Sequence, residues 1–212
     1  MSTQKAVEKD NQAQSEKTTT RDKILETAIE LFAEKGFNGT TTKEIAEAAE
    51  VNESLIFRHF STKSDLYGAI IEKKIDDEPG IELPIQTYKD TKDDYLIFRS
   101  IAERMLEKCG NDSSFIRLLH FSALEGHELS DMFFNTYVEY VDMLLSDYIE
   151  GRIKDGAFKN VNSLCASQAF IGMIVNHIIV KELFGEKKRN KTSNEELVET
   201  YVTVFLDGIK AK

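Results

Sequence analysis

Apolar side chains recur at intervals of three and four residues along most of the chain, which is the spacing of an amphipathic helix. The first such helix begins near Thr19, a candidate N-cap, and ends at Gly36. Its predicted inward face consists of Ile24, Leu25, Ala28, Leu31 and Phe32. No stretch shows a useful length of strand-like alternation. The pattern therefore predicts an all-α protein.

Shorter helices are predicted next, each opened by a residue that favours helix N-caps. Thr41 and Glu44 have the spacing of a capping box. Asn52 is placed to cap the following helix, and Thr62 with Asp65 to cap the one after that. These signals divide the chain before residue 77 into a group of short helices.

The two helices within residues 41–60 are predicted to form a helix-turn-helix. Two helices cross steeply only if small residues lie at the crossing and apolar residues point inward. Ala46 supplies the small contact, while Val51 and Ile56 fill the angle between the helices. The second helix then has a free outer face and a polar start at residues 52–54 that could enter a major groove. A helical hairpin in an unrelated all-α domain has similar spacing, so both interpretations stay open.

Groups that suit phosphates surround this pair of helices. Hydroxyl and basic side chains donate hydrogen bonds to phosphates, and helix N-termini add backbone N–H donors. The candidate phosphate-binding residues are Thr41, Thr42, Lys43, Arg58, His59 and Lys63.

A change in composition separates this region from the rest of the chain. Residues 76–90 hold both prolines, a glycine and several acidic residues, which is typical of a linker. Helical periodicity resumes beyond them, over residues 90–109, 112–125, 129–154, 161–184 and 193–209. We therefore expect a disordered polar arm at 1–17, a first domain at 18–78 and a second helical domain at 79–212.

The net charge of the chain bears on whether nucleic acid can be a partner. The 212 residues carry 27 basic and 37 acidic side chains, a net charge of −10, which at first argues against a nucleic-acid partner. Residues 1–75 hold 11 basic and 13 acidic side chains, so most of the excess lies beyond them. Two cysteines and a polar start without the apolar segment of a signal peptide favour a cytoplasmic protein.

A series of short patterns runs in order through residues 21–70. They are Ile-Leu-x-x-Ala, Leu-Phe, Gly-aromatic, paired Thr, Ile-Ala, Ala-x-Val, aromatic-x-His-Phe and Lys-x-x-Leu. They fall at Ile24-Leu25, Ala28, Leu31-Phe32, Gly36-Phe37, Thr41-Thr42, Ile45-Ala46, Ala49-Glu50-Val51, Phe57-Arg58-His59-Phe60 and Lys63-Ser64-Asp65-Leu66. This stretch resembles the DNA-binding domain of the TetR family of bacterial transcription regulators.

The resemblance implies that residues 18–78 form a helix-turn-helix DNA-binding domain and that residues 79–212 form a bundle for ligand binding and dimerisation. It implies a recognition helix opened by Asn52, Glu53 and Ser54, with phosphate contacts from Thr42, His59 and Lys63.

Two positions depart from the family pattern. The turn glycine is replaced by Glu50, which costs about 1–2 kcal/mol if the backbone there needs a positive φ. The usual tyrosine is Phe57, which lacks a hydroxyl for a phosphate. These departures define an alternative function, a small-molecule-binding helical dimer with weakened or lost DNA binding.

The last two predicted helices are apolar over wide arcs. Residues 169–180 are apolar nearly all round, so this helix must be buried on more than one side. The run is shorter than the roughly 20 residues of a membrane span, so no membrane partner is expected. The resemblance implies that both helices pack against a second copy of the chain, whereas a core within one domain is the other interpretation. The expected dimer-interface residues are Phe170, Gly172, Ile174, Ile178, Val198, Tyr201, Val202 and Phe205.

The middle helices carry aromatic, methionine and histidine side chains. The resemblance implies that an unidentified small-molecule effector binds among them, although a stripe of this kind is more often plain core. Buried polar side chains need partners, which a ligand, a neighbouring side chain or water could supply. The candidate effector-binding residues are Phe98, Met105, Leu119, His120, Phe133, Tyr137, Phe170, Met173, Asn176 and His177.

No pattern for catalysis or metal binding is present in the sequence. His120 and His127 are two helical turns apart, roughly 10 Å, and there is no cysteine pair at metal spacing and no phosphate-binding glycine loop. We therefore expect no enzyme activity, no metal and no cofactor. The expected function is that of a repressor that binds a palindromic operator in double-stranded DNA as a homodimer. A small apolar or amphipathic effector would release it.

Overall fold

A computed structural model describes residues 20–76, 84–111, 114–184 and 192–211 of the chain. Within these ranges the protein is helical apart from turns and one isolated β-bridge between Phe158 and Lys210. The all-α prediction is confirmed. The predicted arm at 1–17, the N-cap at Thr19 and residues 77–83 of the predicted linker lie outside the described residues.

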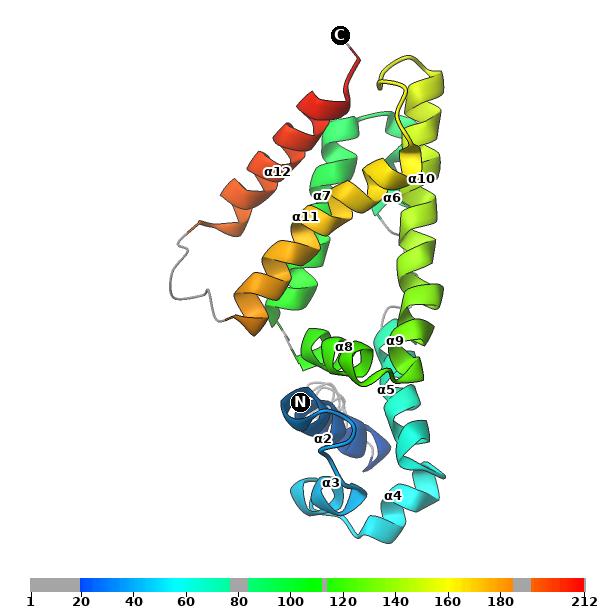
Figure 1. The fold of residues 1–212 in the computed structure, drawn as a ribbon, viewed down its shortest axis with the longest axis vertical. Helices are drawn as coiled ribbons and strands as arrows, with labels where there is room; N and C mark the ends of the chain where they lie inside the picture. The colour runs from blue at the N-terminus through cyan, green and yellow to red at the C-terminus, as the bar shows by residue number, and fades with distance from the viewer. Residues whose placement is uncertain (1–19, 77–83, 112–113, 185–191, 212) are drawn as a thin grey trace, which may run out of the picture.

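The N-terminal unit forms one end of an elongated molecule (Figure 1). It consists of α2 (Thr20–Lys35), α3 (Thr42–Ala48), α4 (Glu53–His59) and α5 (Lys63–Asp76). Phe32 and Tyr67 are completely buried in its core, where their ring centroids are 4.7 Å apart. The inward face predicted for the first helix is confirmed at Ile24, Leu25, Ala28 and Phe32, which are all 0% exposed.

The helices of this unit begin where their capping residues predict. Thr41 and Glu44 form the capping box, in which the Glu44 carboxylate accepts the Thr41 N–H at 2.8 Å. The Asn52 side chain caps α4. Thr62 and Asp65 exchange side-chain and backbone hydrogen bonds of 2.9 and 3.0 Å at the start of α5.

The C-terminal unit contains the longer helices. Its elements are α6 (Pro84–Tyr88), η1 (Lys89–Thr91), α7 (Asp94–Asn111), α8 (Ser114–Glu125), α9 (Glu128–Phe133), η2 (Phe134–Val138), α10 (Glu139–Lys154), α11 (Ser163–Leu183) and α12 (Asn194–Ile209). The predicted linker thus contains α6, because proline suits the first helical position. The single helix predicted over 129–154 is also corrected, since η2 is a π-helix that interrupts it between α9 and α10.

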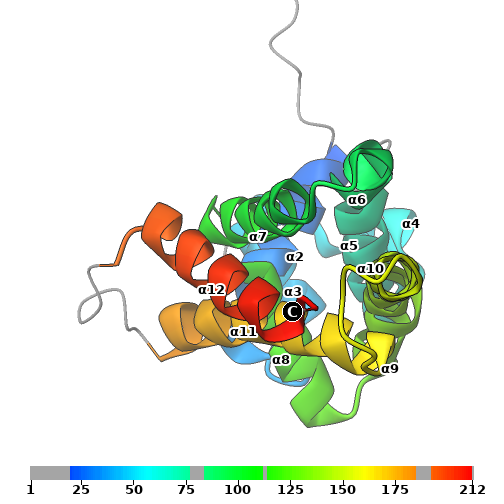
Figure 2. The same ribbon diagram turned by 90° about the horizontal axis from the view of Figure 1, so that it is seen from above.

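Helices α7, α10, α11 and α12 enclose a second core (Figures 1 and 2). Phe98 is completely buried in it, and its ring centroid lies 4.8 Å from that of Phe170 and 4.9 Å from that of Phe205. Beside this core the Asp94 carboxylate accepts two hydrogen bonds from the Arg152 guanidinium at 2.8 and 3.0 Å. Aromatic packing and this bidentate salt bridge hold α7 against its neighbours.

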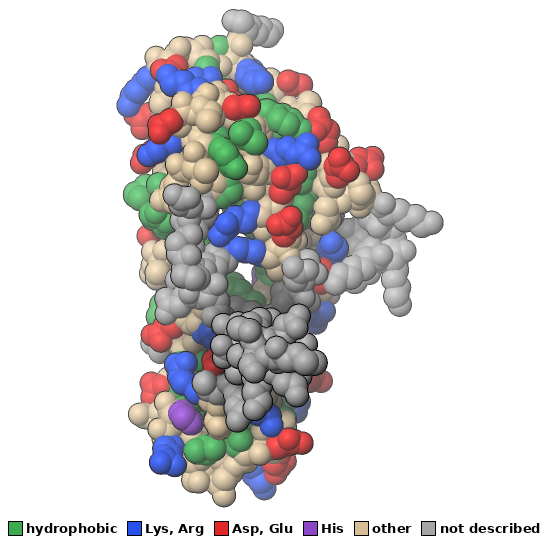
Figure 3. Space-filling model, turned by 180° about the vertical axis from the view of Figure 1, so that it is seen from behind, with side chains coloured by type: hydrophobic (Ala, Val, Ile, Leu, Met, Phe, Trp, Pro, Cys, Tyr) green, Lys and Arg blue, Asp and Glu red, His purple; other side chains and the backbone are tan. Residues whose placement is uncertain are grey.

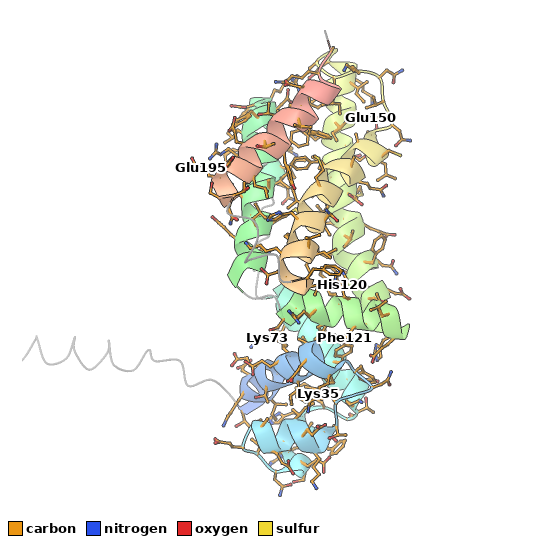
Figure 4. All side chains as sticks on the ribbon, turned by 60° about the vertical axis from the view of Figure 1, so that its left-hand side comes forward. Lys35, Lys73, His120, Phe121, Glu150 and Glu195 are labelled. Carbon is orange, nitrogen blue, oxygen red and sulfur yellow. The ribbon has the colours of Figure 1, made fainter. Side chains whose placement is uncertain are left out.

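Helix α8 lies across the junction of the two units (Figure 4). Leu118 of α8 is completely buried in the N-terminal core. Its carbonyl oxygen accepts a hydrogen bond from the Tyr67 hydroxyl at 3.2 Å, and burial raises the pKa of Tyr67 to about 12. The core of the N-terminal unit is therefore completed by a helix from the C-terminal half of the chain.

Candidate DNA-binding site

The turn between α3 and α4 sets the angle of the second helix. Ala49 ends α3, Glu50 has φ 53°, and the Val51 N–H donates to the Ala46 carbonyl oxygen at 2.9 Å. Glu50 therefore adopts the left-handed conformation that glycine favours, and its replacement of the family glycine carries a backbone cost. Its carboxylate pairs with the Lys23 ammonium at 3.2 Å, but both side chains are exposed, so the pair offsets little of that cost.

Helix α4 buries Ile56 and presents its other side to solvent. Phe57 is 49% exposed on this outer surface. The N-cap Asn52 and the α4 residues Ser54, Arg58 and His59 are also exposed. A surface that combines an aromatic ring with polar and basic groups suits the base edges and phosphates of DNA. On the face seen in Figure 3, this end of the molecule carries basic, acidic and hydrophobic side chains intermixed.

Thr42 and Glu53, both predicted to contact DNA, contact each other. The Thr42 hydroxyl donates to the Glu53 carboxylate at 2.6 Å and so joins the first turn of α3 to the first turn of α4. A phosphate would have to compete with Glu53 for this hydroxyl hydrogen. The sequence did not indicate this pairing, because the two residues belong to different helices.

Thr41 and Lys43 stand at the start of α3 with different surroundings. The Thr41 hydroxyl takes part in the capping box with Glu44, whereas Lys43 is exposed and its ammonium lies 4.0 Å from the Glu47 carboxylate. The Lys35 ammonium donates to the Glu44 carboxylate at 2.9 Å, and this hydrogen bond with those from Thr41 lowers the pKa of Glu44 to about 2. Lys43 is thus the more accessible donor for a phosphate.

Lys63 is partly buried at the first position of α5. Its ammonium donates to the carbonyl oxygens of Phe37 and Thr40 at 2.7 and 2.9 Å and lies 4.0 Å from the centroid of the Phe37 ring. Burial lowers the pKa of Lys63. An ammonium group has three hydrogens, so one is left for the predicted phosphate contact. Lys63 also holds the turn between α2 and α3, which the sequence did not indicate.

The predicted effector-binding residues are divided between the two cores. The residues in or against the C-terminal core are Phe98, Met105, Phe170 and Met173. Leu119 and Phe133 instead pack against the N-terminal core. The ten candidates therefore do not line one site.

The other candidates lie nearer the junction of the units or on the surface. The Tyr137 ring stacks on Phe133 with centroids 5.3 Å apart, and His120 Nδ1 is 2.7 Å from the carbonyl oxygen of Ile116 on the same helix. Asn176 is exposed and His177 is half-buried on α11. A surface hollow of about 470 Å³ includes none of the ten candidates. It is lined by Glu150, Ile153, Lys154, Asn160, Val161, Asn162, Ser163 and Leu164. In the described parts of the chain, no group of His, Cys, Asp or Glu side chains is placed to hold a metal ion.

The predicted dimer interface requires a correction. Five of its residues are buried in the core of their own chain and offer no surface to a partner: Phe170, Ile174, Ile178, Val198 and Val202. Tyr201 and Phe205 are half-buried against the same core. Gly172 is exposed, with open space where a side chain would project. The periodicity found the apolar helices but could not tell which face their own domain would cover.

A short, capped helix that presents a polar and aromatic face beside a second short helix is the arrangement of a helix-turn-helix. The sequence matches the bacterial regulatory proteins of the tetR family over residues 24–70. It matches the C-terminal domain of the AefR-like transcriptional repressors over residues 99–208. The chain belongs to the tetR family of transcription regulators, and the predicted family is confirmed.

Individual relatives agree with this assignment. The chain is 29% identical over 195 residues to the HTH-type transcriptional regulator YvkB of Bacillus subtilis, covering 91% of this chain and 98% of the relative. It is 33% identical over 109 residues to the HTH-type transcriptional repressor Rv3405c of Mycobacterium tuberculosis, covering 51% of this chain and 49% of the relative.

Solved structures show the same fold. AibR in complex with isovaleryl coenzyme A and operator DNA matches with a TM-score of 0.68 and 21% identity, over 88% of this chain and 97% of AibR. The fatty acid degradation regulator FadR from Bacillus halodurans matches with a TM-score of 0.66 and 19% identity, over 91% of this chain and 97% of FadR.

Proposed function

We propose that this protein is a cytoplasmic, ligand-responsive repressor that binds a palindromic operator as a homodimer and is released by a small effector. The observation that carries the proposal is the exposed outer face of α4. Ser54, Phe57 and Arg58 are exposed on this helix, while Ile56 anchors its inner side in the core. We assign the phosphate contacts to Lys43, His59 and the start of α3, and the base contacts to the exposed side chains of α4.

The proposed dimerisation is supported by the length of the recognition helix and by the surface of α11. Helix α4 has 7 residues and reads too few base pairs alone, whereas a two-fold dimer reads two half-sites about 34–36 Å apart. Helix α11 is long and apolar enough to span a membrane by length and composition, yet only 22% of its most apolar stretch is buried in the chain. A second copy packed on the exposed side of α11 and α12, around Gly172 and Val204, would cover this surface.

The effector site is assigned to an aromatic cluster at the junction of the units. Phe133 packs on Phe115 with centroids 5.4 Å apart and on Tyr137 with centroids 5.3 Å apart. The Lys108 ammonium lies 6.0 Å from the centroid of the Tyr137 ring. Apolar rings beside a cationic group suit an amphipathic effector with an acidic end. AibR, which has this fold, was solved with isovaleryl coenzyme A, a molecule of that kind.

Selection of binding sites from random DNA with the purified protein tests the operator. We expect an enriched near-palindrome whose half-sites are about one helical turn apart. Ser54→Ala should change the enriched sequence, because Ser54 is assigned to base contact. If no sequence is enriched, the alternative of a ligand-binding dimer with lapsed DNA binding is favoured, with Glu50 and Phe57 as its causes. Light scattering on the same sample measures the oligomeric state, and a monomer would contradict the dimer.

Thermal melting with isovaleryl coenzyme A, and separately with a medium-chain fatty acid, tests the effector class. We expect either probe to raise the melting temperature of the wild type, because a ligand stabilises the state that binds it. Tyr137→Ala should reduce that increase. Phe134→Ala is the control, because Phe134 is 51% exposed. An equal increase of the melting temperature in both variants would show that the effector binds outside this aromatic cluster.

A further inference from the structure

The carboxylate of Glu125, the last residue of α8, binds the backbone of the N-terminal unit. Its Oε2 accepts the Phe37 N–H at 3.0 Å, and its Oε1 accepts the Asn38 N–H at 3.4 Å. These are successive backbone donors directly after α2.

The shape of this turn allows the carboxylate to approach closely. Gly36 has φ 73°, which favours glycine, and a Cβ atom there would lie 2.7 Å from the Glu125 Oε1 atom and 3.2 Å from the Phe121 ring. A side chain at Gly36 would therefore push the Glu125 carboxylate away from the turn as well as strain the backbone. Figure 4 shows Phe121 on α8 above the end of α2 that carries Lys35.

Lys63 binds the backbone carbonyl oxygens of the same turn, whereas Glu125 binds its backbone N–H groups. The Lys63 ammonium donates to the Phe37 and Thr40 carbonyl oxygens, while the Glu125 carboxylate accepts from the N–H groups of Phe37 and Asn38. The turn is thus fixed between an acidic residue from one unit and a basic residue from the other. Charged groups make stronger hydrogen bonds than neutral ones.

The turn leads directly to the start of α3. Thr40 is completely buried, and its hydroxyl donates to the Gly36 carbonyl oxygen at 2.8 Å, so displacement of Gly36 would move Thr40. The next residue, Thr41, is the N-cap of α3, whose first turn carries Thr42 and Lys43. Any change in the turn therefore alters where the predicted phosphate contacts lie relative to α4 and α5.

We propose that Glu125 is a positioning residue for operator binding, through which α8 holds the turn between α2 and α3 in the shape that DNA contact requires. Displacement of the end of α8 withdraws the carboxylate, leaves the N–H groups of Phe37 and Asn38 to water and loosens the start of α3. The proposal rests on the proposed DNA-binding function.

The test compares Glu125→Gln with Glu34→Gln in the full-length protein. Both variants remove one negative charge, but Glu125 accepts hydrogen bonds from the turn, whereas Glu34 is exposed near the end of α2. Removing an acidic charge near DNA favours binding, so charge alone predicts equal or tighter binding for both. We expect Glu125→Gln instead to bind the selected duplex about tenfold more weakly, and Glu34→Gln to bind as tightly as the wild type or more tightly.

Amide hydrogen exchange at Phe37 and Asn38, measured by NMR without DNA, gives an independent readout. We expect about tenfold faster exchange at these two amides in Glu125→Gln and no change in Glu34→Gln. Glu125→Asp keeps the charge and should restore part of both the protection and the affinity. It also serves as the test protein if Glu125→Gln does not fold.

Unchanged exchange at both amides, or DNA affinity in Glu125→Gln equal to that of Glu34→Gln, would overturn the proposal. If the wild-type protein selects no DNA sequence, the proposed function fails. The exchange measurement then still decides whether Glu125 holds the turn.

Discussion

The two units of the molecule differ in how far apart in the sequence the residues of their characteristic contacts lie. In the N-terminal unit, α3, α4 and α5 each begin at a side chain that caps the helix through contacts within three residues. In the C-terminal unit, the ring of Phe98 meets aromatic rings from α10, α11 and α12 and from the segment after α10. Local contacts thus set where the helices of the N-terminal unit begin, whereas distant contacts hold the bundle together. Helix α8 connects the two, because Leu118 belongs to the N-terminal core.

The largest effect is expected from removing the centre of the bundle. Phe98→Ala should lower the free energy of unfolding by about 3–5 kcal/mol, because it removes a completely buried ring and leaves a cavity. Urea unfolding followed by circular dichroism measures this change. Phe134→Ala removes a ring that is 51% exposed and should have a much smaller effect. Equal effects would mean that Phe98 is not central to the bundle.

A stabilising change is expected in the local unit. Glu50→Gly should raise the free energy of unfolding by about 1 kcal/mol, because glycine tolerates the positive φ at this position. Glu47→Gly is the matched control and should lower it by about 1 kcal/mol, since residue 47 is helical. Thermal melting distinguishes the two variants, because the melting temperature should rise in Glu50→Gly and fall in Glu47→Gly. A lower melting temperature for Glu50→Gly would show that this turn does not carry the inferred strain.

The salt dependence of DNA binding tests the role of Lys63. If its remaining hydrogen reaches a phosphate, Lys63→Ala lowers the slope of log affinity against log salt by about one unit. We expect this decrease on both the selected duplex and random DNA, together with weaker binding. Lys35→Ala is the control, since the Lys35 ammonium is bound to Glu44. An unchanged slope with weaker binding would assign Lys63 to the turn alone.

The smallest effect is expected at acidic pH. The pKa of Glu44 is lowered from 4.5 to about 2 by the Lys35 hydrogen bond and those from Thr41. Its contribution to stability is therefore complete above pH 4.5 and is lost as the pH falls from about 4.5 to about 2. Glu44→Gln should flatten the decrease of melting temperature over this range.

Much of the N-terminal unit could be predicted because the residues that start and end its helices lie within a few residues of the helix ends that they determine. The capping box at Thr41 and Glu44, the cap at Asn52 and the stop at Gly36 are each local. The bundle was predicted less completely. The sequence indicated long apolar helices, but the interruption at η2 and the buried face of α11 depend on neighbours that periodicity does not identify.

The sequence by itself determined the all-α class and the capping residues of the short helices, because these follow from helical spacing and from hydrogen bonds between near neighbours. Only the tertiary structure decided that Phe170 and Ile174 belong to the core of one chain, that Thr42 binds Glu53, and that Glu125 binds the turn after α2. Glu125 is 88 residues from Phe37 along the chain. No local pattern relates two residues so far apart, and only the packing of α8 on α2 brings the carboxylate to the backbone that it holds.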